Sequence, residues 1–198
     1  MRKEKLEELK TYLEELKTIK TNKIVNPKNK FIESEVYDFT LNNGRTIKRE
    51  KILKQGKDGS AVIVMPVLEN GEILTVIEPR VFTNLGIGIG FPAGYVEKGE
   101  KTEVAALREL REETGFVPKE IIELASFYQD EGCSSAFNTI YLGKDCKKMY
   151  PQDLDESEIV RYMSFNYKEL LELEVYGYIK GCNSCLALEK SKKYFKEK

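Results

Sequence analysis

The sequence contains no histidine and no tryptophan. Without histidine, the chain cannot form a Ser-His-Asp triad, a Cys-His dyad, a histidine-ligated zinc site or a histidine general base. Acid–base chemistry near neutral pH must then come from carboxylates, lysine, tyrosine, cysteine or a metal-bound water molecule. Without tryptophan, any aromatic stacking on a ligand must use tyrosine or phenylalanine.

Excess charge and long apolar runs are also missing. The 32 lysine and arginine residues are balanced by 33 aspartate and glutamate residues, so the formal net charge is −1. Nucleic-acid binding usually needs a basic excess, so we expect no nucleic-acid partner. No apolar run approaches the roughly 18 residues of a transmembrane helix, and the N-terminus MRKEKLEELK is too charged for a signal peptide. We therefore expect a cytoplasmic protein with no membrane partner.

The four cysteines are Cys133, Cys146, Cys182 and Cys185. In a cytoplasmic protein they are expected to be reduced thiols. Cys182 and Cys185 form a C-x-x-C pair, which could be a redox pair or half of a zinc site. Because the other two cysteines lack matching spacing, two small residues near the start of a terminal helix are the preferred interpretation.

The length of 198 residues fits one domain with a small accessory unit. We place this unit at residues 1–56 and expect it to hold a helix and an antiparallel hairpin. Residues 3–20 are predicted to be the helix, and residues 31–54 the hairpin, which turns at Asn42-Asn43-Gly44. The helix has an apolar stripe, which we expect to pack on the rest of the chain or on a partner subunit. The stripe consists of Leu6, Leu9, Leu13 and Leu16.

Residues 57–198 alternate short apolar runs with helical patterns, which predicts an α/β domain with a mixed sheet packed by helices. Strands are expected at residues 61–68, 73–77, 91–95, 121–128, 137–142 and 159–165. Helices are expected at residues 102–114, 167–175 and 183–197, and loops at residues 81–90 and 144–156. Thr102 is the expected N-cap of the first of these helices, and Gly115 is its expected C-terminal glycine.

Residues 94–116 carry the most informative pattern. Its four carboxylates belong to Glu100, Glu109, Glu112 and Glu113. The last three are i, i+3 and i+4 neighbours, so they share one face of a helix. Arg108 precedes Glu112 by one helical turn and could orient its carboxylate. The apolar residues expected to anchor the helix in a core are Val104, Ala106, Leu107 and Leu110.

A solvated acidic helix face is the simplest explanation of such a charge run, but two observations weigh against it. Glycines bracket the segment at positions 94, 99 and 115, which indicates tight backbone geometry. The clustered charges would also repel one another without a counter-ion. Because hard oxygen ligands suit Mg²⁺ or Mn²⁺, the segment predicts a site for one of these ions.

The spacing of these residues resembles the Nudix box at every specified position. The matching pattern is Gly94-x5-Glu100-x7-Arg108-Glu109-Leu110-x-Glu112-Glu113-x-Gly115-Phe116. The resemblance implies a hydrolase that cleaves a phosphoanhydride in a nucleoside diphosphate linked to another group. It also implies an α/β/α sandwich with a mixed sheet, in which the box forms loop–helix–loop. By similarity, Glu109 and Glu113 are metal ligands, and Glu112 is a further carboxylate at or behind the metal.

The segment Phe91-Pro92-Ala93-Gly94 is similar to the Pro-Ala-Gly segment of ADP-ribose and ADP-sugar pyrophosphatases. In that group the alanine carbonyl is a metal ligand, which implies this role for Ala93. Arg80 lies where the group has an arginine that contacts substrate, and Arg45 and Arg49 are further candidates for phosphate contacts. The N-terminal hairpin is similar to the small domain that pairs subunits in these enzymes, which implies a homodimer.

Two departures from that group affect the substrate. The turn Gln129-Asp130-Glu131-Gly132 has Glu131 where the group often has proline, and no tryptophan is present to clamp adenine. Tyr37, Phe39 or Tyr128 could take the place of tryptophan. The leading prediction is hydrolysis of ADP-ribose to AMP and ribose 5-phosphate. The alternatives are GDP-mannose, UDP-glucose or a nucleoside triphosphate as substrate, or a non-catalytic module that senses a nucleotide.

The general base must be sought among carboxylates because histidine is absent. Related ADP-sugar pyrophosphatases deliver a catalytic glutamate on a mobile loop, which resembles the acidic segment 153–158. Glu158 matches best because it immediately precedes an apolar strand, and Glu156 is the second candidate. A purely solvated loop is the alternative.

Overall fold

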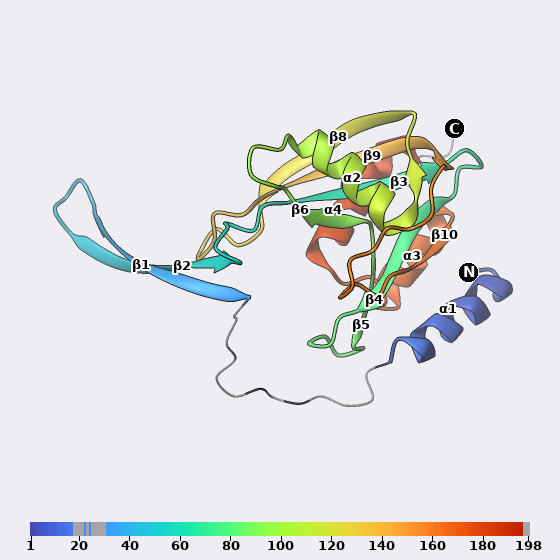
Figure 1. Ribbon diagram of the computed structural model, residues 1–198, viewed down its shortest axis with the longest axis horizontal. Helices are drawn as coiled ribbons and strands as arrows, with labels where there is room; N and C mark the ends of the chain where they lie inside the picture. The colour runs from blue at the N-terminus through green and yellow to red at the C-terminus, as the bar shows by residue number, and fades with distance from the viewer. Residues whose placement is uncertain (18–21, 23, 25–30, 196–198) are drawn as a thin grey trace.

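The structure is a computed structural model that describes residues 1–17, 22, 24 and 31–195 (Figure 1). The helices are α1 (Lys3–Glu15), α2 (Thr102–Thr114), α3 (Tyr167–Val175) and α4 (Cys182–Ser191), followed by the 3₁₀ helix η1 (Lys192–Tyr194). The strands are β1 (Ile32–Thr40), β2 (Thr46–Lys54), β3 (Ala61–Leu68), β4 (Ile73–Pro79), β5 (Ile87–Gly90), β6 (Ala93–Tyr95), β7 (Phe116–Val117), β8 (Glu120–Tyr128), β9 (Phe137–Lys148) and β10 (Arg161–Phe165).

The main sheet has eight strands and is mixed. Its central path runs β10-β4-β3-β9-β7, with β5 paired to β4, β6 to β3 and β8 to β9. β3 and β9 are parallel, and the other pairs of this sheet are antiparallel. The mixed α/β architecture predicted from the sequence is therefore confirmed.

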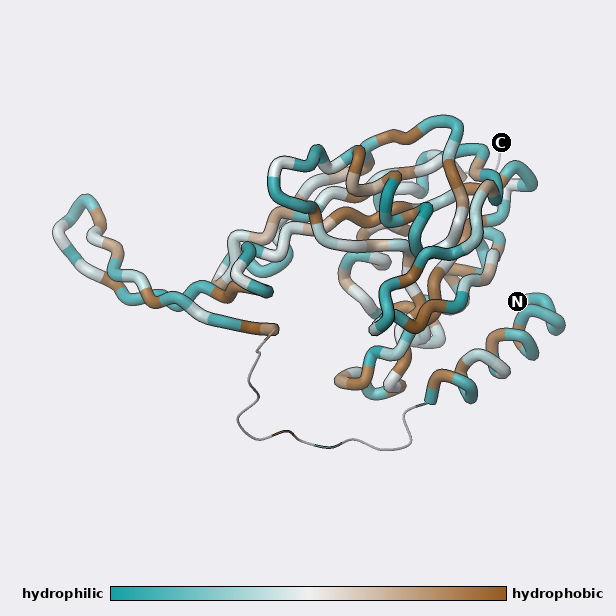
Figure 2. The backbone as a smooth tube through the Cα atoms, viewed as in Figure 1, coloured by the Kyte–Doolittle hydropathy of each residue, from teal (hydrophilic) through white to brown (hydrophobic). Residues whose placement is uncertain are grey.

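The alternation of side chains along β3 divides the interior into two apolar layers. Val62 and Val64 face the layer that contains Ala105, Ala106 and Leu110 of α2. Ile63 and Met65 face the opposite layer, which α1, α3 and α4 cover. Figure 2 shows apolar residues concentrated in the central strands that separate these layers. Helices thus cover both faces of the sheet, as in an α/β/α sandwich.

Helix α2 has the predicted bounds but a different N-cap. Lys101 is the N-cap, with no side-chain cap hydrogen bond, while the hydroxyl of Thr102 lies 2.8 Å from that of Tyr141. Gly115 ends the helix as predicted, with a left-handed φ of 76°. Two of the predicted core anchors, Val104 and Leu107, are instead 52% and 36% exposed. The helix packs through its alanines and Leu110, which allows a close approach to β3.

Several predicted loop boundaries are wrong. Residues 87–90 of the expected loop form β5, because Ile87 and Ile89 alternate inward and pair with β4. β9 continues to residue 148, past its expected end, because Cys146 is buried and Lys147 pairs with Val117. β10 begins later than expected, and α4 ends at Ser191 before η1. The predicted helical residues 18–20 lie outside the described residues.

Helix α1 packs on the rest of the chain, one of the two alternatives predicted for its leucine stripe. Leu9 and Leu16 are buried in the same apolar layer as Met163 and Phe165 of β10. Arg2 forms an ion pair with Glu169 at 2.7 Å. Within the described residues, no helix combines the length and apolar character that crossing a membrane requires.

The cysteines are free thiols, as expected. Cys182 and Cys185 lie in the first turn of α4, which agrees with the preferred interpretation of their spacing.

The predicted hairpin is present as β1 and β2, which pair antiparallel from Ile32↔Lys54 to Thr40↔Thr46. It extends away from the α/β body (Figure 1). All nine residues of β1 are exposed. At the base of the hairpin, the N–H of Ile52 donates to the carbonyl of Cys133 at 2.8 Å.

Candidate active site

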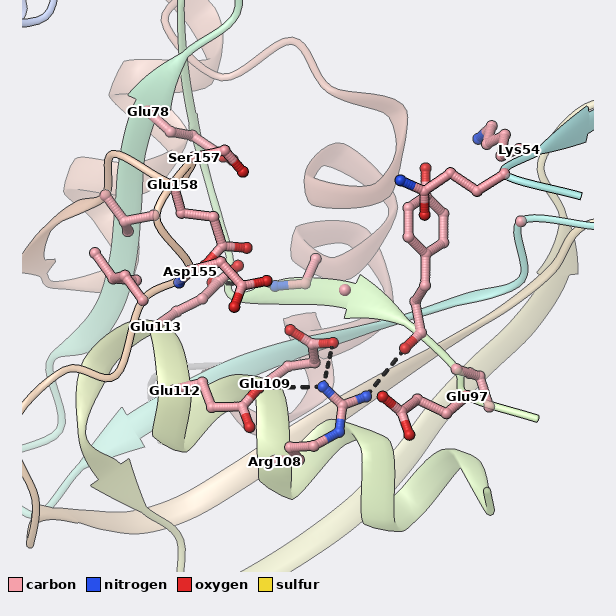
Figure 3. Close-up of a pocket in the computed structure, with 18 of the residues that line it drawn as sticks. Lys54, Glu78, Glu97, Arg108, Glu109, Glu112, Glu113, Asp155, Ser157 and Glu158 are labelled. Carbon is pink, nitrogen blue, oxygen red and sulfur yellow. Dashed lines mark hydrogen bonds and ion pairs between the residues drawn. The ribbon is translucent and has the colours of Figure 1, made fainter. Parts of the chain in front are cut away.

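A cavity of about 930 Å³ lies beside α2, where β4 and β6 meet the segment before β10 (Figure 3). The acidic residues that line it are Asp58, Glu78, Glu97, Glu109, Glu112, Glu113, Asp153, Asp155 and Glu158. The fold therefore gathers carboxylates from a helix, a strand and a loop that are distant in sequence.

Glu109 approaches β6 closely because residue 94 is glycine. A Cβ atom built at Gly94 would lie 2.0 Å from Cδ and 2.1 Å from Oε1 of Glu109. Any larger residue would therefore occupy the position of the carboxylate. This glycine of the box is explained by the contact between β6 and α2.

Arg108 donates hydrogen bonds to three carboxylates of the box, and Figure 3 shows those to Glu109 and Glu112. Its Nη1 atom donates to Glu109 at 2.7 Å and to Glu112 at 3.1 Å. Its Nε and Nη2 atoms each donate to Glu100 at 3.0 Å. The predicted contact between Arg108 and Glu112 is confirmed, and the guanidinium also joins the helix to the loop that carries Glu100.

Glu113 is the most buried carboxylate of the site, with 7% of its surface exposed. The N–H of Ala93 donates to its Oε2 atom at 3.3 Å. Burial raises the pKa of Glu113 well above its usual range, and the charges of Glu78 and Glu109 raise it further. Within the described part of the chain, no cationic side chain pairs with Glu113.

The pKa values of Glu78 and Glu109 are also raised, chiefly by burial. The positive charge of Arg80 lowers the pKa of Glu78, and that of Arg108 lowers the pKa of Glu109, but neither cancels the effect of burial. The site thus holds several partly desolvated carboxylates whose mutual repulsion is only partly offset.

The segment before β10 is tied to the C-terminal end of α2. The Nε2 atom of Gln152 donates to the carbonyl of Glu113 at 2.6 Å, and the N–H of Asp153 donates to the carbonyl of Glu112 at 2.8 Å. These bonds also satisfy carbonyls that the end of a helix leaves unpaired. They hold the acidic segment against the helix that carries the box.

Glu158 lines the cavity beyond this anchor (Figure 3). Its carboxylate accepts the N–H of Asp155 at 3.0 Å. Its charge raises the pKa values of Glu78, Glu109 and Glu113, which places it in their electrostatic neighbourhood. Glu156, the second candidate base, is not among the residues that line this cavity in the described part of the chain.

The other predicted site residues are divided between the cavity and the periphery. Ala93 and Arg80 line the cavity, and Arg80 forms an ion pair with Glu78. Tyr37, Arg45 and Arg49 belong to the hairpin, Tyr128 ends β8, and Glu131 lies in the exposed turn that follows β8. Within the described chain these five residues do not line the cavity, and their roles stay predictions.

Sequence reasoning did not select Glu78 as a site residue. The available signal was a charged residue at the end of the apolar run of β4, directly before Pro79. The acidic loop was recognised, but Asp153 and Asp155 were not singled out within it.

Residues 57–180 match the model of the NUDIX domain, which is more than half of the chain. The chain belongs to the Nudix family. Among its Nudix relatives, the "ADP-ribose pyrophosphatase" of Bacillus subtilis (strain 168) is 36% identical over 145 residues, which cover 73% of this chain and 76% of that protein. The "Methanol dehydrogenase activator" of Bacillus methanolicus is 35% identical over 159 residues, which cover 80% of this chain and 82% of that protein.

A solved crystal structure of an ADP compounds hydrolase has the same fold. It matches with a TM-score of 0.71 and 22% sequence identity, covering 91% of this chain and 97% of that chain. These comparisons confirm the predicted Nudix fold and the predicted class of enzyme, a Nudix hydrolase.

The carboxylates of this Nudix site suit a divalent cation in their chemistry, since Mg²⁺ and Mn²⁺ prefer hard oxygen ligands. The burial of Glu113 beside other carboxylates is also what a neighbouring cation would offset. In the described residues, however, no three acidic or cysteine side chains already converge as a metal cluster. Arg108 engages Glu109 and Glu112 in this arrangement, so cation binding would require these side chains to adjust.

Proposed function

We propose that the chain is a metal-dependent diphosphatase that hydrolyses a nucleoside diphosphate sugar. The proposed substrate is ADP-ribose, and the products are AMP and ribose 5-phosphate. The observation that carries this proposal is the box helix α2, whose carboxylates line a cavity of about 930 Å³ together with Glu78, Arg80 and Glu158. Similarity to the Bacillus subtilis protein named ADP-ribose pyrophosphatase supports the choice of substrate.

Glu109, Glu112 and Glu113 are proposed to hold Mg²⁺ or Mn²⁺, with the carbonyl of Ala93 as a further ligand. Such an ion, when bound, offsets the negative charge of the phosphates and lowers the pKa of water. Glu109 and Glu112 line the cavity and accept hydrogen bonds from Arg108, and these contacts would rearrange when an ion binds.

The remaining steps belong to side chains of the chain itself. Arg80 has a guanidinium that can contact phosphate oxygens. Glu158, with Glu156 as the second candidate, accepts a proton from the attacking water. A bond forms between the water oxygen and one phosphorus atom, and the bridging phosphorus–oxygen bond breaks. The departing phosphate takes the electron pair of that bond.

We also propose that the unit of residues 1–56, chiefly through its hairpin, mediates a homodimer of a cytoplasmic protein. Support comes from the exposed apolar and aromatic side chains of β1, which include Val36, Tyr37 and Phe39. In such a dimer, Tyr37, Arg45 and Arg49 would be available to a substrate bound by a second copy.

A panel of nucleotides tests the proposed reaction. The purified chain is assayed with ADP-ribose, ADP-glucose, GDP-mannose, UDP-glucose and ATP, each with Mg²⁺ and with a chelator, and the products are separated by chromatography. We expect equimolar AMP and ribose 5-phosphate from ADP-ribose, with Mg²⁺ only. No hydrolysis of any nucleoside diphosphate sugar would overturn the proposal, and preference for another nucleotide would reassign the substrate.

A second candidate function is activation of a dehydrogenase, favoured by similarity to the Bacillus methanolicus protein named methanol dehydrogenase activator. Its test is the rate of an alcohol dehydrogenase with and without this chain. An unchanged dehydrogenase rate beside active ADP-ribose hydrolysis would exclude this candidate for the dehydrogenase tested.

A further inference from the structure

The side chain of Arg80 is constrained on two sides. Its Nη2 atom forms an ion pair with the carboxylate of Glu78. Its aliphatic stem crosses Gly88, where a built Cβ atom would lie 2.6 Å from the Cγ atom of Arg80. Glu78 and Gly88 are direct partners in the pairing of β4 with β5, so the sheet register brings both constraints together. A side chain larger than hydrogen at position 88 would push the arginine stem aside.

Arg80 lies at the junction of two cavities. The first is the catalytic cavity, and the second is a chamber of about 720 Å³ between the β4–β5 connection and the start of α4. The residues that line both cavities are Glu78, Arg80 and Ala93. Arg80 is 54% exposed at its side chain, whereas Glu78 is 23% exposed. The guanidinium is therefore accessible to an anion, while the carboxylate beneath it is largely covered.

A carboxylate at position 78 is unfavourable by itself in a cavity that receives a diphosphate. Its charge repels phosphate and adds to the repulsion around Glu113. Arg108, the other arginine of the catalytic cavity, is already paired with Glu100, Glu109 and Glu112. Arg80 pairs with one carboxylate where Arg108 pairs with three, so of these two arginines in the described lining it keeps more donors for phosphate, and its orientation depends on Glu78.

We propose that Glu78 is a positioning residue that holds the guanidinium of Arg80 at the junction of the two cavities, presented to the diphosphate of the substrate. Gly88 is the second part of this arrangement, because it leaves the space that the arginine stem occupies. The inference rests on the proposed function, since it takes a diphosphate as the group that Arg80 meets. It assigns roles to two residues outside the Nudix box.

Steady-state hydrolysis of ADP-ribose with Mg²⁺ tests this inference in the full-length chain. The variants are Glu78→Gln, Gly88→Ala and Arg80→Ala, alone and combined. We expect Glu78→Gln and Gly88→Ala each to raise KM by roughly tenfold, because a hydrogen bond to a charged group contributes about 1.5 kcal/mol or more. We expect kcat to change less than about threefold, since neither residue is proposed to touch the reacting atoms.

The sign of the KM change separates positioning from simple electrostatics. If Glu78 acted only through its charge, the substitution Glu78→Gln would remove a repulsion between this charge and the phosphates of the substrate. KM would then fall. If it positions Arg80, its removal raises KM, and neither Glu78→Gln nor Gly88→Ala adds to the effect of Arg80→Ala. The Gly88→Ala variant changes no charge, so a raised KM there supports the geometric explanation independently.

Two matched controls accompany these variants. Glu103→Gln removes an exposed carboxylate of α2 that does not line either cavity in the described chain, and Gly90→Ala alters the same strand as Gly88 at a point where a Cβ atom would meet Ser184 instead of Arg80. We expect KM values within about twofold of the parent chain for both. Thermal melting checks that each variant is folded. If Gly88→Ala does not fold, the double-mutant cycle of Glu78→Gln and Arg80→Ala tests the positioning role without it.

Failure of this inference can be distinguished from failure of the proposed function. If the parent chain hydrolyses no diphosphate, the proposed function fails. If the parent chain is active, the positioning role is overturned by unchanged or lowered KM in Glu78→Gln. Full additivity of Glu78→Gln with Arg80→Ala, or a loss of kcat at constant KM, overturns it equally.

Discussion

At the scale of single residues, Glu113 shows a conflict between burial and charge. The residue is 7% exposed, and its carboxylate lies among other acidic groups. Because its pKa is raised in the folded chain, the folded state binds a proton more readily than the unfolded state does. Stability from this group is therefore present at low pH and is lost as pH rises from the usual glutamate range through the raised pKa.

The variant Glu113→Gln should be more stable than the parent chain at pH 7.5 when a chelator is present. Each kcal/mol gained raises the melting temperature by roughly 2–4 °C for a chain of this size. The same variant should lose at least about 100-fold in kcat, since a metal ligand contributes several kcal/mol to charge stabilisation. Thermal melts and hydrolysis assays measure the two effects.

The exposed glutamate of the same helix, Glu103, supplies the control. Glu103→Gln should leave both the melting temperature and kcat close to the parent values. Addition of Mg²⁺ should raise the melting temperature of the parent chain but not that of Glu113→Gln, because a ligand stabilises only the state that binds it. Equal stabilisation of both by Mg²⁺ would contradict the assignment of Glu113 as a ligand.

At the scale of elements, one carboxylate joins α1 to the start of α3. Glu169 accepts hydrogen bonds from the backbone N–H of Arg2 at 2.9 Å and from its Nη2 atom at 2.7 Å. It also completes a capping box with Asn166, whose side chain accepts the N–H of Glu169 at 2.9 Å. The Arg2 guanidinium lowers the pKa of Glu169 to about 2.

We expect Glu169→Gln to lower the free energy of unfolding by about 2–3 kcal/mol at pH 7, as for a comparable native carboxylate whose pKa is strongly depressed. The depressed pKa stabilises the fold above the usual glutamate range, and this stability is lost as pH falls toward 2. The difference in free energy of unfolding between Glu169→Gln and the parent chain should therefore shrink as the pH is lowered from about 5 to 2. Urea unfolding at several pH values measures it.

A surface ion pair of the same type serves as the comparison. Glu189 of α4 pairs with Lys192, the first residue of η1, and is 61% exposed at its side chain. Glu189→Gln should change the free energy of unfolding by less than about 1 kcal/mol. A loss as large as that of Glu169→Gln would show that burial of the carboxylate is not what makes the contact with α1 important.

At the scale of the whole molecule, the hairpin extends from the α/β body (Figure 1) and its first strand is left uncovered. All nine residues of β1 are exposed, and Tyr37 and Phe39 remain 40% and 50% exposed although their rings lie 6.0 Å apart. An isolated two-stranded hairpin is at best marginally stable in water. These features favour a second copy of the chain as the surface that covers the hairpin.

The double variant Tyr37→Ser/Phe39→Ser should shift the protein from dimer to monomer at micromolar concentration. Aromatic anchors at the centre of an interface contribute about 2 kcal/mol or more each. Light scattering coupled to size-exclusion chromatography measures the mass. Lys48→Gln, at an exposed ion pair with Asp38, is the control and should leave the mass unchanged. A parent chain that is monomeric at all concentrations would refute the expected homodimer.

Prediction from sequence succeeded where the information is local. The C-terminal end of α2 followed from Gly115, and the hairpin followed from its Asn-Gly turn. Prediction failed at β5, where alternating glycines suggested a loop, and at the far end of β9. In both cases pairing with another strand, β4 for β5 and β7 for β9, stabilises a segment whose own composition does not indicate a strand.

The amino-acid sequence by itself determined the Nudix box, because Glu109, Glu112 and Glu113 lie within two turns of one helix and their spacing sets the face they share. Only the tertiary structure decided that Glu78 joins Arg80 and Glu158 beside them, that Glu113 is buried and that the hairpin is left exposed. These properties arise from pairing and packing between segments far apart in the chain. Local periodicity carries no information about such contacts.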